Sequence, residues 1–434
     1  MERSLNLFAN ALFFVYLCIR KQEIFRFIIK VSSFFIVIGL YARRDDGLIF
    51  SSLFGESENN LYLCRTKTNM MKMMWMILFM LLPLLAMVYI GWHIWCLLPV
   101  KWYLKTIVII LMVASFLLLF SGIRRSTDSM PMPLATTVYI VGTSSIFILL
   151  YLFMLFLFLD LGRLTHLLPR TLLYNNWWTV GGISIFMFGL FVYGHLHYKH
   201  KVRQELTITS HKMTKPVKAV LLSDLHIGYH NQRDEVHRWI DLINDEKPDM
   251  ILIAGDIIDG SIRPLKEQRI YEEFQRLKAP VYACLGNHEY YSGEPGALEF
   301  YQQAGIHLLR DSVVSVGDLC IIGRDDATNM RRKPVAELSS AVDYSKFTIL
   351  LDHQPHHLEK AEEAGIDFQF SGHTHRGQVW PISWITDAIY ECSWGSHQRG
   401  NTRYYVSSGI GIWGGMFRIG TRSEYVVLEV RGQK

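Results

Sequence analysis

The sequence predicts two unlike parts, an α-helical membrane region of about four spans followed by an α/β C-terminal domain. Two observations predict this division. Hydrophobic residues make up 50% of the 434-residue chain and concentrate before about residue 198. After that point charged residues and glycines return, and short apolar runs alternate with amphipathic segments. A chain of this length can hold two or three domains.

Four stretches of the N-terminal half are long and apolar enough to cross a bilayer, which takes about 20 residues in a helix. They cover residues 73–100, 106–123, 135–161 and 177–197. Charged residues or prolines bound them, for example Arg124 and Arg125 after the second stretch. Trp177 and Trp178 open the fourth, where interfacial aromatic residues are typical. We therefore expect a four-helix transmembrane anchor over residues 70–200.

Residues 1–69 are interpreted as an uncertain N-terminal extension with short apolar segments. Residues 5–19 and 27–41 are apolar but short, and Lys30 interrupts the second segment. They lack the charged, apolar and small-residue order of a cleavable signal peptide. Methionines cluster around Lys72, so we hypothesise that the natural chain starts at Met70. An N-terminal peptide upstream of Met70 in the native protein would dismiss this hypothesis.

The distribution of Lys and Arg in the short connections predicts an integral, multi-pass protein with a cytoplasmic C-terminal domain. An even number of spans places both ends of the membrane region on one side. Eight basic residues then lie on the side of the C-terminal domain, namely Arg65, Lys67, Lys72, Arg124, Arg125, Lys199, Lys201 and Arg203. Four lie opposite, namely Lys101, Lys105, Arg163 and Arg170.

The C-terminal domain, residues 201–434, has the pattern of buried strands joined by crossover helices. Residues 217–222, 250–254, 281–285, 347–351 and 368–370 are short strand-like runs. Residues 234–246 and 264–277 have the apolar spacing of helices. In such folds the functional residues gather at the carboxyl ends of the strands.

Each predicted strand ends in a cluster of Asp, Asn or His. In order, the clusters contain Asp224 and His226, Asp256 and Asp259, Asn287 and His288, His353, and His373 and His375. Residues two apart on an extended segment face the same side, so Asp224 and His226 can point to one side, and His373 and His375 repeat this geometry. Oxygen and nitrogen donors without thiolate favour Mn, Fe, Zn or Co over a structural zinc site.

Cysteine and charge patterns exclude other classes of protein. None of the six cysteines lies in a Cys-x-x-Cys pair, so neither a disulfide framework nor a zinc ribbon is expected. The net charge of +5 comes without a basic stripe, so no nucleic-acid partner is expected.

At the five clusters the sequence resembles the calcineurin-like metallophosphoesterases. Their motifs are Asp-x-His, Gly-Asp-x-x-Asp, Gly-Asn-His-Glu/Asp, a single His and Gly-His-x-His, and the match covers residues 215–432. The chain is most similar to a membrane-associated branch whose last motif is Gly-His-Thr-His-Gly-Gly-Gln. The resemblance implies a four-layer αββα sandwich of two mixed sheets flanked by helices.

The resemblance also implies roles for individual residues. One divalent ion would be held by Asp224, His226, Asp256 and His375, and the other by Asp256, Asn287, His353 and His373. Mn is expected first, with Fe, Zn or Co as alternatives. His288 would face the substrate and Asp259 would orient it.

The sequence departs from related patterns at two positions. Protein Ser/Thr phosphatases have Arg where this chain has Gly260, which argues against that activity. Arg376 replaces a glycine of the membrane-associated branch. A guanidinium at this position can bind a phosphate, and a solvated loop arginine is the alternative.

The expected function is hydrolysis of a phosphoester or diphosphate bond by a hydroxide that bridges the two metals. Residues 379–400 carry many aromatic and aliphatic side chains, which either contact lipid or pack on the core. With the anchor, they favour a lipid-linked substrate such as UDP-diacylglucosamine, with the bilayer as partner. The alternatives are a catalytically silent phosphate sensor and a transporter. Apart from His93, the ionisable residues of the spans lie at span ends, namely Asp160, His195, His197 and His200. The sequence therefore shows no polar cluster within the membrane, which argues against a transporter.

Overall fold

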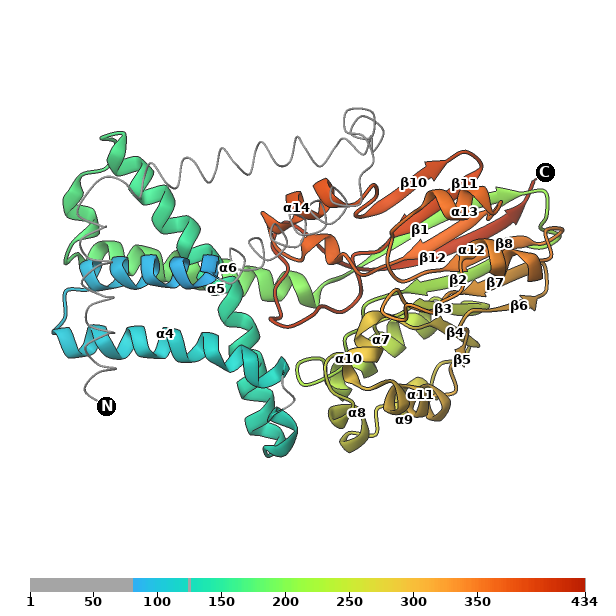
Figure 1. Cartoon of the computed structure of the whole chain (residues 1–434), viewed down its shortest axis with the longest axis horizontal. Coiled ribbons are helices and arrows are strands. Elements are labelled where there is room, and N and C mark those ends of the chain that lie inside the picture. The colour runs from blue at the N-terminus through green and yellow to red at the C-terminus, as the bar shows by residue number, and fades with distance from the viewer. Residues whose placement is uncertain (1–80, 124–125, 434) are drawn as a thin grey trace, which may run out of the picture. The chain divides into compact units, whose positions relative to one another are not determined.

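The computed structural model describes residues 81–123 and 126–433, all of which belong to one compact unit. The predictions for residues 1–69, and for the beginning of the first span, fall outside the described residues. Figure 1 shows a set of long helices and, after them in the chain, the strands of the α/β domain.

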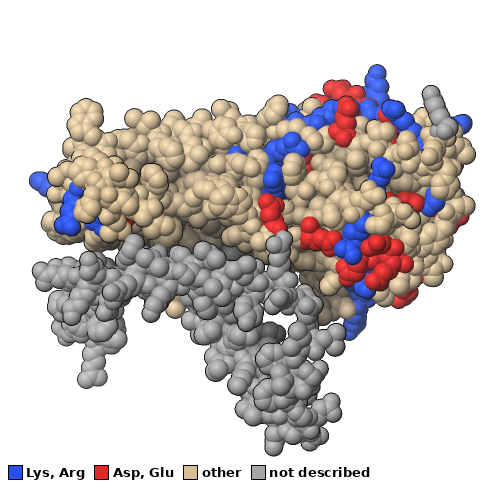
Figure 2. Space-filling model, turned by 90° about the horizontal axis from the view of Figure 1, so that it is seen from above, with Lys and Arg blue, Asp and Glu red and all other residues tan. Residues whose placement is uncertain are grey.

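Three helices in the described part of the chain are long and apolar enough to cross a membrane, namely α4 (Trp102–Ile123), α5 (Met132–Leu164) and α6 (Trp177–Lys199). The described part of the first predicted span, Leu81–Leu97, is apolar but shorter. Short 3₁₀ turns, η1 (Ser126–Ser129) and η2 (Arg170–Leu173), lie in the connections. In Figure 2 the surface of this region is a broad band almost free of charged side chains. Such a band is typical of helices that face lipid.

The α/β domain contains two six-stranded mixed sheets. The first has the order β1 (Lys201–Ser210), β12 (Ser423–Gly432), β2 (Val217–Leu222), β3 (Met250–Ala254), β4 (Val281–Cys284) and β5 (His307–Leu308). The second has the order β10 (Gly395–Arg399), β11 (Thr402–Val406), β9 (Phe368–Ser371), β8 (Phe347–Leu351), β7 (Leu319–Gly323) and β6 (Ser312–Val316). Strands β2 to β5 pair in parallel, as do β7, β8, β9 and β11.

The two sheets face each other across a shared apolar core, to which β2 and β3 contribute Leu221 and Leu252 and β8 contributes Ile349. Helices α7 (Arg233–Asp245), α9 (Tyr271–Phe274) and α11 (Glu294–Gln303) cover the outer face of the first sheet. Helices α12 (Val335–Leu338) and α13 (Glu359–Glu363) cover the second. The four-layer sandwich implied by the family resemblance is therefore confirmed.

The predicted helix over residues 264–277 is interrupted. The structure has two short helices there, α8 (Arg263–Glu267) and α9, and between them Arg269 has φ of 50°. A left-handed residue cannot continue a right-handed helix, so the apolar periodicity extends across a break. Further short elements are α10 (Asn287–Ser292), η3 (Ser339–Ala341), η4 (His375–Gly377) and α14 (Ile382–Ile389).

The last membrane helix joins the α/β domain almost directly. Helix α6 ends at Lys199, and strand β1 begins at Lys201. Beneath this junction Tyr198 is fully buried, and the Lys201 ammonium lies 3.7 Å from the centre of its ring. The connection therefore offers little freedom for the domain to move away from α6.

Candidate active site

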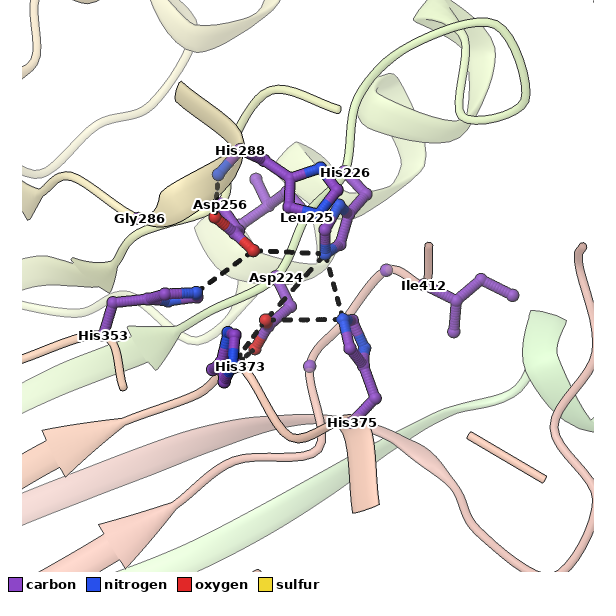
Figure 3. A network of polar contacts seen from close by, with 12 residues as sticks. Asp224, Leu225, His226, Asp256, Gly286, His288, His353, His373, His375 and Ile412 are labelled. Carbon is purple, nitrogen blue, oxygen red and sulfur yellow. Dashed lines mark hydrogen bonds and ion pairs between the residues drawn. The ribbon is translucent and has the colours of Figure 1, made fainter. Parts of the chain in front are cut away.

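Loops at the carboxyl ends of five strands bring the predicted site residues together. Strands β2, β3 and β4 of the first sheet lead to Asp224, Asp256 and Asn287, and β8 and β9 of the second lead to His353 and His373. Figure 3 shows Asp224, Asp256, His353 and His373 converging. The site thus lies where the two sheets of the sandwich meet.

One group of donors consists of Asp224, His226 and His375, whose ligand atoms lie close enough to hold one ion. The Nε2 atoms of His226 and His375 are 3.0 Å apart. The Asp224 Oδ1 atom is 3.5 Å from His375 Nε2 and 3.9 Å from His226 Nε2. Asp224 and His226 are both fully buried.

A second group consists of Asp256, His353 and His373, with Asn287 beside it. The Asn287 Oδ1 atom is 2.9 Å from His373 Nδ1 and 3.2 Å from His353 Nε2. The His353 Nε2 atom is also 3.1 Å from Asp256 Oδ2. His353 Nδ1 faces the Ala254 carbonyl at 2.8 Å, so it carries the proton and Nε2 remains free to bind an ion.

Asp256 lies between the two groups. Its Oδ2 atom is 3.1 Å from His353 in one group and 3.6 Å from His226 in the other. Its Oδ1 accepts the backbone N–H of His288 at 2.9 Å. A side chain at Gly286 would place Cβ only 2.2 Å from this oxygen, so the close approach requires glycine.

The charge of the Asp256 carboxylate is balanced by imidazoles. Burial alone would raise the pKa of this carboxyl, but His353, His288 and His226 lower it well below its usual range. Asp256 therefore stays ionised in the buried site, as a group that binds a cation must be.

The backbone is strained where these residues lie. Asp224, His226, Asp256, His373 and His375 have φ values of 53°, 45°, 53°, 71° and 48°. Left-handed conformations are costly for residues with a Cβ, and they persist where surrounding contacts enforce them. The fold thus holds five of the predicted ligands in unfavourable conformations, which is typical of a functional site.

Asp259 contacts both His226 and His288. Its Oδ1 atom is 3.2 Å from His226 Nδ1, which leaves His226 Nε2 for the first donor group. The same oxygen is 3.4 Å from His288 Nδ1, an ion-pair distance. Burial lowers the pKa of His288, but the charges of Asp256 and Asp259 outweigh it and raise the pKa to about 9. His288 also keeps 14% of its side chain exposed, so it can reach a substrate.

The arrangement fits divalent cations. The Nε2 atoms of His226 and His375 face each other at 3.0 Å, where both could serve as ligands of one cation. Burial and neighbouring His226 lower the pKa of His375 well below its usual range, so its imidazole is neutral, as a metal ligand must be. The described donors include oxygen and nitrogen but no thiolate.

Sequence reasoning assigned no role to Glu289, which is fully buried behind the site. Its carboxylate accepts the backbone N–H groups of Gly286 at 2.7 Å, Asp256 at 3.0 Å and Ile257 at 2.8 Å. It therefore ties the loop after β3 to the loop after β4. Glu289 is the third residue of the short helix α10, a position where Glu commonly caps the N-terminus. This position could have indicated its role from the sequence.

Arg418 is a second residue whose role was missed. It is fully buried and donates hydrogen bonds to the carbonyl oxygens of His375 at 2.7 Å, Gly411 at 3.0 Å and Ser408. It thus holds the loop that carries His375 against two later loops. Arginine is rarely buried unless it is paired, so an arginine at this position is expected to be exposed. The local sequence therefore gave no indication of its burial.

Arg376 points at an aromatic ring. Its guanidinium lies 4.3 Å from the centre of the Trp394 ring, and that of Arg422 lies 4.6 Å from the same centre. The Trp394 indole donates to Glu424 at 3.0 Å. Arg376 therefore places a fixed positive charge next to His375, and its predicted contact with substrate stays a prediction.

The model of the family described as calcineurin-like phosphoesterase matches residues 217–377. A protein of Aquifex aeolicus (strain VF5), described as an uncharacterized metallophosphoesterase, is 30% identical over 253 residues, covering 56% of this chain and 96% of its own. A metallophosphoesterase of Helicobacter pylori (strain J99 / ATCC 700824) is 33% identical over 233 residues, or 52% of this chain and 63% of that one. A Danio rerio "Transmembrane protein with metallophosphoesterase domain" is 30% identical, covering 48% of this chain and 52% of its own.

The chain therefore belongs to the calcineurin-like metallophosphoesterases, and its α/β domain is a metallophosphoesterase domain. Three helices in the described part of the chain are long and apolar enough to cross a membrane, and the Danio relative is named as a transmembrane protein. The chain spans about 63% of the Helicobacter relative and about half of the Danio relative, so these similarities describe the shared domain.

Proposed function

We propose that the protein is a multi-pass membrane phosphoesterase that hydrolyses a phosphoester or diphosphate bond with two divalent cations. The observation that carries the proposal is the meeting of two donor groups at one carboxylate, Asp256. In this proposal Asp224, His226 and His375 hold one cation with Asp256. The residues Asn287, His353 and His373 hold the other with the same carboxylate.

Two such cations supply a coordinated water of lowered pKa and a clamp on the phosphoryl oxygens. His288 keeps part of its side chain exposed, and its protonated imidazole can stabilise negative charge on the phosphoryl group or donate a proton to the leaving oxygen. Asp259 holds the His288 and His226 rings by their Nδ1 atoms. Arg376 adds a fixed guanidinium for a second phosphate.

A lipid-linked substrate is supported by how close the last site loop lies to the membrane helices. The loop that carries His373 and His375 continues directly into Trp380, whose carbonyl accepts a hydrogen bond from Tyr151 of α5 at 2.5 Å. Helix α14 follows, and its Trp384 and Ile389 side chains are 65% and 66% exposed. Exposed Trp and Ile beside a membrane helix are typical of an interfacial segment. UDP-diacylglucosamine remains one candidate substrate.

The metal, the bond type and the orientation complete the proposal. Mn²⁺ is proposed first, because oxygen and nitrogen donors suit it, with Fe, Zn or Co as alternatives. Phosphodiester and diphosphate bonds are proposed over protein phosphomonoesters, because Gly260 replaces the arginine of protein phosphatases. The excess of Lys and Arg on its side of the spans supports a cytoplasmic α/β domain.

The test uses the full chain reconstituted in lipid nanodiscs. After metal is stripped and Mn²⁺ added back, bis-p-nitrophenyl phosphate, p-nitrophenyl phosphate and UDP-diacylglucosamine are assayed beside an Asp256→Asn variant. We expect Mn²⁺-dependent hydrolysis that the variant lacks. Metal binding without hydrolysis of any of the three would contradict the proposal and favour a phosphate sensor.

A further inference from the structure

Helix α5 is longer than a membrane crossing needs, and its excess length lies on the active-site domain. It has 33 residues, whereas about 20 span the hydrocarbon core. Many of its buried residues, including Ala135, Tyr139 and Thr143, belong to its first half. Ala135 and Tyr139 pack against Tyr229, in the loop that follows His226.

Within this contact the hydroxyl of Tyr139 donates a hydrogen bond to Oδ2 of Asp259. The other oxygen of the same carboxylate, Oδ1, faces His226 Nδ1 at 3.2 Å and His288 Nδ1 at 3.4 Å. The two oxygens therefore have separate partners. Oδ2 is held by the membrane helix, with His230 Nδ1 3.9 Å away, and Oδ1 faces the two histidines of the site. Fixing Oδ2 fixes the rotation of the carboxylate, and with it the position of Oδ1.

The Tyr139 ring has its own support, which is independent of the hydroxyl. It stacks on His230 with ring centres 5.4 Å apart and an angle of 19°. His230 Nε2 in turn lies 2.6 Å from the Ile412 carbonyl. Phenylalanine at position 139 would keep this packing and lose only the hydrogen bond.

Helix α5 is also held to the domain at a second place, by the connection that precedes it. Asp128 accepts hydrogen bonds from the hydroxyls of Tyr229 at 2.6 Å and Ser261 at 3.0 Å. Arg263 donates to the carbonyl oxygens of Asp128 at 2.9 Å and Met130 at 2.7 Å. Docking of the helix therefore does not depend on the Tyr139 hydroxyl.

We propose that Tyr139 is a positioning residue of the active site, through which transmembrane helix α5 holds Asp259, and thereby His288 and His226, in their working orientation. The inference rests on the proposed function, because it assigns those residues to catalysis and metal binding. It makes the membrane region part of the catalytic unit as well as an anchor. Partners of ligating histidines commonly affect metal affinity or activity about 10- to 100-fold.

The test compares Tyr139→Phe with a matched control, Tyr229→Phe, in the full chain in nanodiscs. Both variants remove one hydroxyl from the same helix–domain contact, but only Tyr139 reaches Asp259. The readouts are kcat and KM with bis-p-nitrophenyl phosphate at saturating Mn²⁺, the Mn²⁺ affinity of the stripped protein by calorimetry, and Tm.

We expect Tyr139→Phe to lower kcat or Mn²⁺ affinity about 10- to 100-fold with KM little changed, and Tyr229→Phe to leave all three near the wild type. Wild-type behaviour of Tyr139→Phe in both kcat and metal affinity would overturn the inference, as would equal losses in both variants. If the wild-type chain binds Mn²⁺ but hydrolyses nothing, the proposed function fails. In that case Mn²⁺ affinity is the only readout left. The inference is then supported if Tyr139→Phe binds Mn²⁺ more weakly than Tyr229→Phe, and overturned if the two variants bind it equally.

Discussion

Two buried polar clusters in the described part of the chain have similar composition and differ in how their groups are paired. In the membrane region, Asp160 Oδ2 is 2.8 Å from the Tyr89 hydroxyl and 3.1 Å from His93 Nε2, and Oδ1 is 3.3 Å from Arg163. Each donor there meets an acceptor. In the α/β domain, His226 and His375 instead point their Nε2 atoms at each other.

The pairing of buried polar groups thus separates a structural cluster from a functional one. In the cluster around Asp160, Arg163 lies at ion-pair distance from the carboxylate, and Tyr89 and His93 hydrogen-bond to it. Its pairing gives a structural reason for a buried histidine in a span. The cluster around Asp256 instead brings the imidazole nitrogens and carboxylate oxygens of two donor groups close together, as a cation site requires.

The largest expected effect comes from Asp256→Asn, because this carboxylate faces both donor groups. We expect the turnover of bis-p-nitrophenyl phosphate to fall by about 10³-fold or more, since loss of metal removes several kcal/mol of transition-state stabilisation. Metal content by mass spectrometry should fall with it. Full metal content in this variant would refute the bridging role.

His288→Asn should slow turnover about 10²-fold or more while metal binding is kept, because its side chain contributes charge and a proton but is not among the proposed ligands. The effect should appear in kcat. The wild-type kcat should fall as pH rises through the pKa of His288, because the protonated form is then lost. The neighbouring carboxylates raise the pKa of His288 to about 9. Bound cations would lower this pKa, so the fall in kcat should occur at a lower pH.

Replacing two exposed apolar residues of α14, Trp384→Ser with Ile385→Ser, should separate lipid-linked from soluble substrates. We expect about a tenfold loss with UDP-diacylglucosamine in bilayers. Full burial of one apolar side chain contributes about 1.5–3 kcal/mol, so partial insertion of the two together contributes about 1.4 kcal/mol, which is tenfold. Hydrolysis of bis-p-nitrophenyl phosphate should not change. Met330→Ser, an exposed residue of the α/β domain, is the control. Equal losses with both substrates would argue against a lipid contact at α14.

The smallest effect on turnover should come from Asp160→Asn, the counterpart of the Asp256 variant in the paired cluster. We expect kcat to stay within about twofold and Tm to fall, because weaker hydrogen bonds to Tyr89 and His93 cost about 1–3 kcal/mol. A large loss of turnover without a change in Tm would give the membrane cluster a functional role.

The residues brought together at the site could be predicted because each follows a strand within a short motif. Asp224 and His226, or His373 and His375, are separated by one residue, and the order of motifs identified the family. The roles of Glu289, Arg418 and Tyr139 could not be predicted in the same way. Their partners lie in loops and helices that only the folded chain brings near, such as Asp259, 120 residues after Tyr139.

The boundaries and buried faces of helices were also predicted less well, because they depend on the folded chain and not on hydropathy alone. The apolar pattern over residues 264–277 continues through Arg269, whose positive φ breaks the helix without leaving a sign in the hydropathy. In α5, the hydropathy does not distinguish residues that face lipid from those that pack on the α/β domain, because both are apolar. Only contacts with Tyr229 and Asp259 reveal that the first turns of α5 belong to the site.

The most direct test of the central claim is to count metal ions in the wild-type chain and in Asp256→Asn while turnover is measured on the same samples. The protein is loaded with Mn²⁺, freed of excess metal, and analysed by mass spectrometry beside the hydrolysis of bis-p-nitrophenyl phosphate. We expect about two ions per chain with turnover in the wild type, and loss of both ions and turnover in the variant. One ion per chain at full activity, or full turnover in the variant, would contradict it.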